Sequence, residues 1–186
     1  MRVGILTISD KGYRGEREDK SGSAIREFMS GIKAEIKRYQ IVPDEPELIK
    51  KALVDFCDQG LDLILTTGGT GFSPRDFTPE ATREVIERET PGISEAIRIY
   101  GLKKTPRAML SRAVSGIRKR TLIINLPGSE RGVRESLAAV LEVLPHAIEI
   151  LKGEVSECGS KQKKNTKVCA QTRMGHACPA PRRGKR

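Results

Sequence analysis

The sequence contains no tryptophan, and aromatic residues make up 4% of it. Proteins that bind single-stranded nucleic acid stack the bases on aromatic side chains, so this composition argues against that class. Long apolar runs are also missing, because the first one, VGILTI, ends at Ser9 and Asp10. A membrane-spanning helix needs about 20 apolar residues, and a secretory leader needs a longer apolar core than this one. We therefore expect a cytoplasmic protein without membrane contact, whose folded part does not bind nucleic acid.

The four cysteines do not form the close pairs that mark zinc ribbons and thioredoxin-like redox sites. Cys57 falls within a helical pattern, and we expect it to be buried. The other three, Cys158, Cys169 and Cys178, lie near the C-terminus with His176. A metal site that includes His176 and Cys178 is an alternative for that segment, although the spacing matches no standard zinc motif.

The formal net charge of +10 is carried mostly by one end of the chain. Residues 153–186 hold nine lysines and arginines and two glutamates, whereas residues 1–152 are nearly balanced. The C-terminal segment has no periodic apolar pattern, so it cannot bury enough surface to offset the entropy of ordering it. We predict a folded domain over residues 1–152 and a basic, disordered tail over residues 153–186. The tail leaves an RNA-associated protein as an alternative.

Three short apolar segments predict strands that are buried on both faces of a parallel sheet, namely residues 2–9, 61–66 and 121–126. Residues 33–42 alternate less regularly and predict a more exposed strand. Because helical patterns separate the strands, the sequence predicts a single α/β domain with a doubly wound, mostly parallel sheet.

Apolar spacing and end signals predict the helices between these strands. They cover a segment from residue 18 or 21 to 31, residues 45–58, a segment beginning at residue 78, residues 129–144 and residues 146–151. In the second of these helices, Leu48, Ala52, Leu53 and Phe56 are predicted to face the core. Pro145 is predicted to end the helix that precedes it.

Two acids lie just beyond predicted strand ends, and each has a structural as well as a chemical interpretation. Asp44 begins a capping-box pattern with Glu47, so its carboxylate is expected to cap the helix over residues 45–58. Asp76 lies in a Ser-Pro-Arg-Asp turn, and Thr78 is predicted to cap the next helix. Because the carboxyl ends of parallel strands meet at one edge of a sheet, both carboxylates are expected to reach one cleft.

The glycine-rich segment Thr66-Thr67-Gly68-Gly69-Thr70-Gly71 follows a buried strand and precedes a helix. In open α/β sheets ligands bind beyond the carboxyl ends of the strands, and consecutive glycines let backbone N–H groups surround an anion. The segment has neither the Gly-Lys-Ser ending of a P-loop nor the spacing of a dinucleotide fingerprint. From the residues alone it is either a ligand-binding loop or a tight turn.

Polar groups at two further turns are candidates for substrate contacts. Leu110-Ser111-Arg112-Ala113 offers a hydroxyl and a guanidinium, and Asn125-Leu126-Pro127-Gly128-Ser129 offers an amide and the start of a helix. Ser129 also has an ordinary interpretation as a helix cap. The side chains of Arg75, Arg107 and Arg112 are candidates for pairing with phosphate.

Taken in order, these segments resemble the Mog-type molybdopterin adenylyltransferases and the same domain of gephyrin. The resemblance is carried by VGILTISD, EDKSG, VPDE, TTGGTG, RD, TPEAT, the Pro-Gly pair at residues 91 and 92, LSRA and INLPGS. It extends from residue 2 to residue 151 and does not include the basic tail with its cysteines.

This resemblance implies a three-layer α/β/α fold, commonly a trimer, that combines molybdopterin and ATP into adenylylated molybdopterin and pyrophosphate. The product then passes to the molybdate-inserting enzyme. The essential acids fall on Asp44 and Asp76, and the molybdopterin-contacting serine falls on Ser111. The other residues implicated in substrate binding are Thr67, Gly68, Gly69, Thr70, Gly71, Asn125, Pro127, Gly128 and Ser129.

The chemistry of this reaction predicts roles for the two acids. A phosphate monoester has a second pKa of about 6, so the phosphate of molybdopterin is largely ionised at neutral pH and needs no general base. Bringing this dianion to the α-phosphorus of ATP requires a cation, and Mg²⁺ is held by one or two carboxylates with phosphate oxygens and water. We therefore expect Asp76 to ligate or orient Mg²⁺ at the triphosphate, and Asp44 to hold either a second Mg²⁺ or the water shell of the metal. Two alternatives stay open, a molybdopterin-binding protein without catalysis and a nucleotide pyrophosphatase on the same fold.

Overall fold

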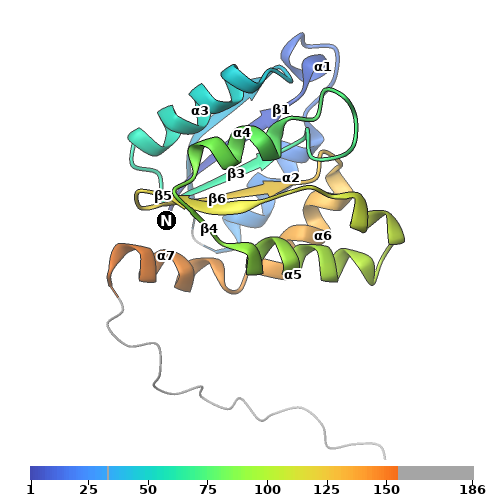
Figure 1. Cartoon of the computed structure of the whole chain (residues 1–186). Helices are drawn as coiled ribbons and strands as arrows, with labels where there is room; N and C mark the ends of the chain where they lie inside the picture. The colour runs from blue at the N-terminus through green and yellow to red at the C-terminus, as the bar shows by residue number, and fades with distance from the viewer. Residues whose placement is uncertain (33, 155–186) are drawn as a thin grey trace, which may run out of the picture. The chain divides into compact units, whose positions relative to one another are not determined.

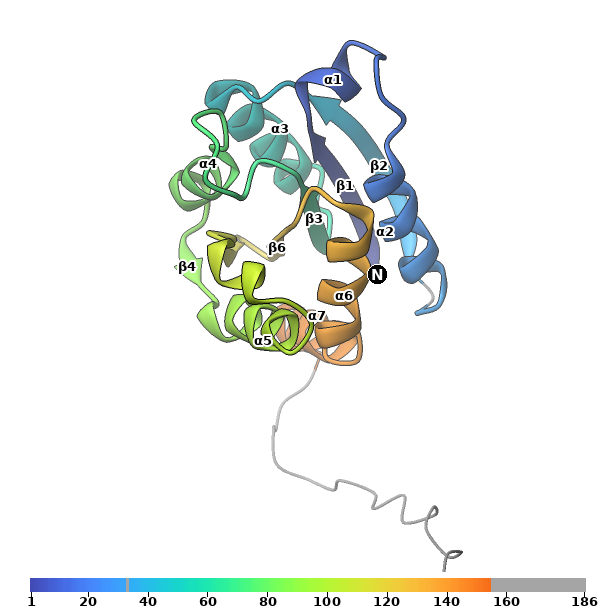
Figure 2. The same ribbon diagram turned by 90° about the vertical axis from the view of Figure 1, so that its right-hand side faces the viewer.

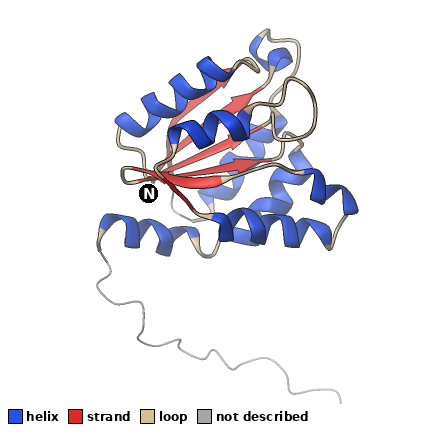
Figure 3. Ribbon diagram, in the orientation of Figure 1, coloured by secondary structure: helices blue, strands red, loops and turns tan. Residues whose placement is uncertain are grey.

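The computed structural model describes residues 1–32 and 34–154, which form a sheet between two layers of helices (Figures 1 and 3). The strands are β1 (Arg2–Ile8), β2 (Glu35–Val42), β3 (Leu63–Thr67), β4 (Arg88–Glu89), β5 (Ser115–Arg118) and β6 (Thr121–Leu126). The helices are α1 (Asp10–Tyr13), α2 (Lys20–Ser30), α3 (Pro46–Asp58), α4 (Thr78–Val85), α5 (Pro91–Leu102), the 3₁₀ helix η1 (Pro106–Leu110), α6 (Glu130–Val140) and α7 (Leu144–Lys152).

The sheet has the order β2-β1-β3-β6-β5-β4. Its first four strands pair in parallel, and β5 and β4 are added antiparallel at the other edge. Figure 2 shows α3 and α4 over one face of the sheet and α2, α5, α6 and α7 over the other. The predicted three-layer, mostly parallel α/β fold is therefore confirmed.

The three central strands β1, β3 and β6 are the apolar segments that the sequence singles out. Successive residues of β1 face opposite layers, because Val3 and Ile5 pack with α2 and α6 whereas Leu6 and Ile8 pack with α3. All four side chains are buried. The strand predicted over residues 33–42 is β2, which lies at an edge of the sheet and is mostly exposed, as expected.

The buried face of α3 differs by one residue from the prediction. Ala52, Leu53 and Phe56 are buried as expected, but Leu48 is 39% exposed and the neighbouring Ile49 is fully buried. Ile49 precedes Leu53 by four residues and Phe56 by seven, so these three side chains share one face of the helix. Leu48 lies about 100° away around the helix axis, which turns it towards solvent.

Pro145 starts a helix and does not end one, contrary to the prediction. The helix predicted over residues 129–144 ends earlier, because α6 stops at Val140. Pro145 then lies in the first turn of α7, where the missing backbone N–H costs no hydrogen bond. Val133 and Leu144 are nevertheless both buried, so the predicted apolar face persists across the break.

The region between α4 and β6 was not predicted from the sequence pattern. It contains the antiparallel strands β4 and β5 together with α5 and η1. The two strands have two and four residues, too few for a period-2 pattern to be recognised. The 3₁₀ helix η1 leads directly into Ser111, one of the predicted substrate-binding residues.

Several further predictions concern burial and the C-terminal segment. Cys57 is buried as expected, and burial raises the pKa of its thiol to about 11. No helix within residues 1–32 and 34–154 is long and apolar enough to cross a membrane. From residue 155 onward, the predicted disordered tail lies outside the described residues, as does the alternative metal site at His176 and Cys178.

Asp19 links the start of α2 to the two strands beside it. One carboxylate oxygen accepts hydrogen bonds from the Gly22 N–H at 2.8 Å and from the Ser21 hydroxyl at 2.7 Å. The other accepts from the hydroxyls of Thr7 and Tyr39 at 2.5 and 2.7 Å. Burial alone would raise the pKa of Asp19, but the four hydrogen bonds outweigh it and leave the pKa below its usual value.

We predict that Asp19→Ala lowers the free energy of unfolding by about 3 kcal/mol, because the α2 cap and three hydroxyls lose one charged acceptor. Urea denaturation at neutral pH measures the loss, and exposed Glu18→Ala is the matched control, expected within about 0.5 kcal/mol of wild type. A lowered pKa means that the stabilisation is present above the usual aspartate range and is lost on acidification. The two proteins should therefore converge at low pH, and a constant difference would contradict this role for the charge.

Candidate active site

The loops that follow β1, β3 and β6 meet at the carboxyl edge of the parallel strands. Gly68 lies at their centre with a φ of 100°, and a Cβ built on it would lie 2.1 Å from the carbonyl oxygen of Ile8. A Cβ on Gly128 would lie 3.1 Å from the Cα of Gly68. The hydroxyl of Thr67 donates a hydrogen bond to the carbonyl oxygen of Pro127 at 2.7 Å. Three backbone segments are thus in direct contact, with no room for a side chain between them.

Thr78 holds the glycine-rich loop from the other side. Its hydroxyl donates a hydrogen bond to the carbonyl oxygen of Gly68 at 2.9 Å, and its N–H donates to the carbonyl oxygen of Gly69 at 3.1 Å. The predicted helix cap is therefore wrong, since the N-cap of α4 is Phe77 and Thr78 is the first helical residue. The hydroxyl is occupied by the loop and not by the helix.

Asp44 pairs with Asp10 at the ends of β2 and β1. Asp44 Oδ2 accepts a hydrogen bond from the Asp10 N–H at 2.9 Å, and Asp10 Oδ1 accepts one from the Asp44 N–H at 3.1 Å. The predicted capping box is wrong, because the N-cap of α3 is Glu45 and no side chain caps that helix. Burial raises the pKa of Asp44, and the negative charges of Asp10 and Asp76 raise it further. The hydrogen bond from the Asp10 N–H lowers the pKa, but by less than these effects raise it.

Asp76 lies in the exposed loop between β3 and α4. Its Oδ2 accepts a hydrogen bond from the Ser73 N–H at 3.2 Å. The preceding residue, Arg75, places its Nε 2.8 Å from Asp10 Oδ2 and donates a second hydrogen bond to the carbonyl oxygen of Asp44 at 3.4 Å. This guanidinium lowers the pKa of Asp10. Arg75 therefore ties the loop that carries Asp76 to the strand end that carries Asp44.

The structure divides the predicted cleft into two cavities that meet at Gly69, Gly128 and Ser129. The Ser111 cavity, of about 610 Å³, is lined by Ser111 and Asp76 and also by Thr70, Gly71, Pro127 and residues of α5, η1 and α6. The Asp19 cavity, of about 700 Å³, is lined by Asp19 and Asp44 and also by Thr7, Ser9, Ser21, Thr67 and Gly68. Both volumes lie within the usual range for small-molecule sites.

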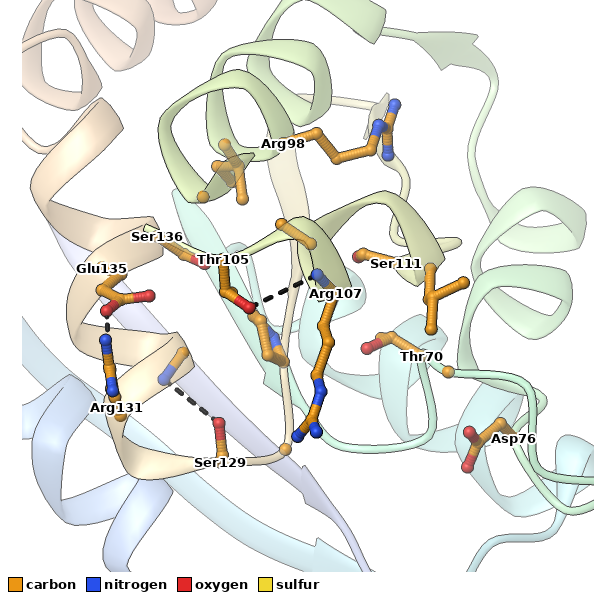
Figure 4. Close-up of a pocket in the computed structure, with 18 of the residues that line it drawn as sticks. Thr70, Asp76, Arg98, Thr105, Arg107, Ser111, Ser129, Arg131, Glu135 and Ser136 are labelled. Atoms are coloured by element: carbon orange, nitrogen blue, oxygen red, sulfur yellow. Dashed lines mark hydrogen bonds and ion pairs between the residues drawn. The ribbon is translucent and has the colours of Figure 1, made fainter. Parts of the chain in front are cut away.

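Three arginines and two acids, Asp76 and Glu135, are the charged residues that line the Ser111 cavity (Figure 4). Arg98 donates to the carbonyl oxygen of Ala113 at 2.8 Å, and Arg131 Nε lies 2.8 Å from a carboxylate oxygen of Glu135. The guanidinium of Arg107 makes no hydrogen bond or ion pair within the part of the chain that the structure describes, and its side chain extends towards the loop of Ser129. Arg107 is therefore available to pair with an anionic group in the cavity.

The donor set around the glycine-rich loop fits a magnesium ion that is shared with phosphates. A Cβ on Gly69 would lie 3.4 Å from Asp44 Oδ1, and a Cβ on Gly71 would lie 2.9 Å from Asp76 Oδ2. The two carboxylates thus flank the loop, one on each side. Residues 1–32 and 34–154 contain no group of three His, Cys, Asp or Glu side chains that could hold a metal alone. Mg²⁺ needs no such group, because it usually takes one or two carboxylates and completes its shell with phosphate and water.

Asn125 does not reach either cavity. Its side chain is fully buried, donating to the hydroxyls of Thr66 at 3.0 Å and Thr82 at 2.9 Å and accepting from the Val114 N–H at 3.3 Å. Ser129 does line both cavities, although its hydroxyl also caps α6 by accepting from the Gly132 N–H at 3.1 Å. Asn125 thus joins β6 to β3 and to α4 by buried hydrogen bonds.

Sequence reasoning missed Asp10 and Asp19 as residues of the site. Asp10 lies two residues after the end of β1, as Asp44 does after β2, so the strand-end rule that selects Asp44 would have selected it as well. Asp19 lies within the EDKSG segment, where its helix-capping role hides its position in the cavity wall.

Comparisons with known proteins agree on one family. The model of a family described as a probable molybdopterin binding domain matches residues 4–146. A molybdopterin adenylyltransferase from Helicobacter pylori is 42% identical over 164 residues, covering 87% of this chain and 93% of that protein. One from Escherichia coli is 36% identical over 173 residues, covering 84% and 88%. The crystal structure of the molybdopterin biosynthesis enzyme MoaB from Thermus thermophilus superposes with a TM-score of 0.78 at 61% identity, covering 82% of this chain and 96% of that one.

The crowding at Gly68 can be tested by adding one methyl group. We predict that Gly68→Ala costs about 3 kcal/mol or more, because the new Cβ meets the Ile8 carbonyl and no flexible side chain can yield. Gly15→Ala is the matched control, since Gly15 also has a positive φ but nothing lies within 4 Å of its Cβ position, and it should cost about 1 kcal/mol. Urea denaturation measures both. Equal losses would mean that the backbone angle alone requires the glycine.

Proposed function

This chain belongs to the family of the probable molybdopterin binding domain, and on this basis we propose that it is a molybdopterin adenylyltransferase. The resemblance to the Mog-type proteins that the sequence motifs indicate is confirmed by these relatives. In the proposed reaction, an oxygen of the molybdopterin phosphate forms a bond to the α-phosphorus of ATP. The bond from that phosphorus to the bridging oxygen breaks, and pyrophosphate leaves.

The observation that carries this proposal is the pair of cavities that share one glycine-rich boundary. A transfer reaction needs two substrates held with their reacting groups in contact, and positioning alone supplies much of the acceleration. The Ser111 and Asp19 cavities meet at Gly69, Gly128 and Ser129. We assign the pterin to the Ser111 cavity and the nucleotide to the Asp19 cavity, so that their phosphates meet at the shared loop.

Polar groups in each cavity suit these assignments. The guanidinium of Arg107, which has no partner among the described residues, can pair with the phosphate of molybdopterin, and the hydroxyl of Ser111 faces the same space (Figure 4). The Asp19 cavity presents the hydroxyl of Ser9 and the side chain of Lys20, which can donate hydrogen bonds to a ribose and its phosphates. The hydroxyl of Thr7 donates to Asp19 and can therefore only accept a hydrogen bond from a ligand. Backbone N–H groups of the glycine-rich loop lie between the two and can bind phosphate oxygens.

In this proposal Asp44 and Asp76 hold Mg²⁺, which when bound neutralises the charge of the triphosphate and of the leaving pyrophosphate. Neither acid needs to accept a proton, since the attacking phosphate is already ionised. Asp10 orients Asp44 through their reciprocal hydrogen bonds, and Arg75 keeps the Asp76 loop against that pair.

The experiment that tests the function is pyrophosphate release from ATP and Mg²⁺, with and without molybdopterin, by the full-length protein. We expect release only when molybdopterin is present, together with adenylylated molybdopterin detected by mass spectrometry. Release without molybdopterin would identify a nucleotide pyrophosphatase. Binding of molybdopterin without any release would identify a molybdopterin-binding protein that is not catalytic.

Asp76→Asn is predicted to lower the rate of pyrophosphate release by about 10²-fold or more while leaving molybdopterin affinity nearly unchanged. The amide keeps an acceptor for the Ser73 N–H but removes the charge that would hold the cation. Steady-state kinetics and equilibrium binding of molybdopterin separate the two effects. Asp55→Ala, an exposed acid on α3, is the control and should match wild type. Loss of pterin binding in Asp76→Asn would contradict the metal role.

Asp44→Asn is predicted to abolish most activity and yet to stabilise the metal-free protein at neutral pH. The raised pKa of Asp44 means that its charge is less favourable in the folded than in the unfolded chain, so removing the charge removes a cost. Asparagine retains an acceptor for the Asp10 N–H. As the pH falls through the pKa of Asp44, the wild-type carboxyl becomes neutral and the difference in Tm should vanish. A variant that is less stable at neutral pH would show that the charge is structural.

A further inference from the structure

Arg112 directly follows Ser111 but points away from both cavities into the loop that carries Asp76. Its Nε donates a hydrogen bond to the carbonyl oxygen of Gly71 at 2.7 Å, and its Nη2 donates to the carbonyl oxygen of Asp76. Its backbone N–H donates to the carbonyl oxygen of Thr70 at 3.0 Å. Arg112 was considered for phosphate pairing from the sequence, but here its guanidinium is taken up by the protein itself.

The guanidinium of Arg112 bonds to both ends of this loop, at Gly71 and at Asp76. Gly71 begins the segment that leaves the glycine-rich loop, and Asp76 ends it just before α4. No side chain between residues 71 and 77 is buried, and Phe72 in this segment is 66% exposed. The loop therefore has no apolar core of its own, and its conformation depends on the polar contacts that cross it.

Glu80 holds the guanidinium in place from the first turn of α4. Its Oε1 pairs with Nη1 of Arg112. Its Oε2 is buried and has no hydrogen-bond partner among the residues that the structure describes. The Glu80 side chain as a whole is 40% exposed, but its buried oxygen is compensated only by the charge of Arg112 among these residues, which favours keeping the two side chains paired.

We propose that Arg112, oriented by Glu80, is a positioning residue that fixes the carboxylate of Asp76 beside the glycine-rich loop. The planar guanidinium has donors in a fixed fork and reaches two carbonyls and one carboxylate at once, which a lysine ammonium cannot do in the same geometry. Arg112 also directly follows Ser111. The same two-residue segment therefore lines the Ser111 cavity and holds the loop that carries Asp76. This role rests on the proposed function, in which Asp76 is a ligand of Mg²⁺.

The test uses the full-length variants Arg112→Ala, Arg112→Lys and Glu80→Gln. Arg118→Ala is the matched control, because Arg118, like Arg112, donates to a backbone carbonyl, but to that of Val85 at the C-terminal end of α4, at 3.0 Å. In Arg112→Ala we expect the Mg²⁺ concentration for half-maximal pyrophosphate release to rise by about tenfold or more, with a similar fall in kcat. The KM for molybdopterin should stay within about threefold.

Rescue and conservative variants separate positioning from a general loss of structure. Low, non-denaturing concentrations of guanidinium should restore part of the activity of Arg112→Ala but not change Arg118→Ala. Arg112→Lys and Glu80→Gln keep part of the contact set and should fall between wild type and Arg112→Ala. If Arg112→Ala does not fold, these two variants test whether Arg112 positions Asp76. Wild-type dependence on Mg²⁺ in a folded Arg112→Ala, or in both conservative variants, would overturn the proposal.

A readout that needs no turnover keeps this proposal distinct from the proposed function. Amide hydrogen exchange over residues 70–77 and binding of Mn²⁺ followed by electron paramagnetic resonance can both be measured without molybdopterin. We expect faster exchange in that segment and weaker Mn²⁺ binding in Arg112→Ala, with neither change in Arg118→Ala. If wild type releases no pyrophosphate the proposed function fails, yet these two measurements still decide the role of Arg112. Unchanged exchange and Mn²⁺ binding would overturn it.

Discussion

The close approach of three backbone segments at Gly68 is the constraint on which the rest of the site depends. The carbonyl of Ile8, Gly68 itself and Gly128 come from the ends of three different strands, and they touch without side chains between them. Parallel strands that end at one edge can bring their loops this close only where Cβ atoms are missing. The contact makes one narrow boundary out of three loops, and the two cavities lie on either side of it.

Charge around this boundary is arranged unevenly. Asp10 is stabilised in its ionised form by Arg75, whereas burial and neighbouring acids make the charge of Asp44 unfavourable. Asp76 lies across the glycine-rich loop from Asp44. The proposed reaction brings phosphates to the same place, and Coulomb repulsion would oppose it unless a cation lay between these groups. In the proposed reaction, such a cation would offset the unfavourable charge of Asp44.

The loop that carries Asp76 is held by polar contacts and not by packing. Arg75 reaches from within the loop to Asp10, and Arg112 reaches into it from the segment after η1. Thr78 ties the start of the next helix to Gly68. Two of these contacts end on a cavity wall, because Gly71 lines the Ser111 cavity and Gly68 lines the Asp19 cavity. Such a loop can be well placed while having few apolar contacts to resist local opening, which makes its tethers sensitive points for substitution.

The sequence by itself determined the layers of the fold, because buried strands and amphipathic helices are local patterns that need no knowledge of their partners. It also located the glycine-rich loop and the acids at the strand ends, since chain order decides which residues follow a parallel strand. The hydrogen-bond partners of Asp44 and Thr78 were not determined in this way. Both residues match local capping patterns, yet their side chains turn to Asp10 and Gly68, which are distant in sequence. Only the tertiary structure could decide between these partners, because a side chain can bond to any group that the fold brings within its reach. For the same reason only the structure could distinguish the guanidinium of Arg112, which bonds to the Asp76 loop, from that of Arg107, which has no partner within residues 1–32 and 34–154.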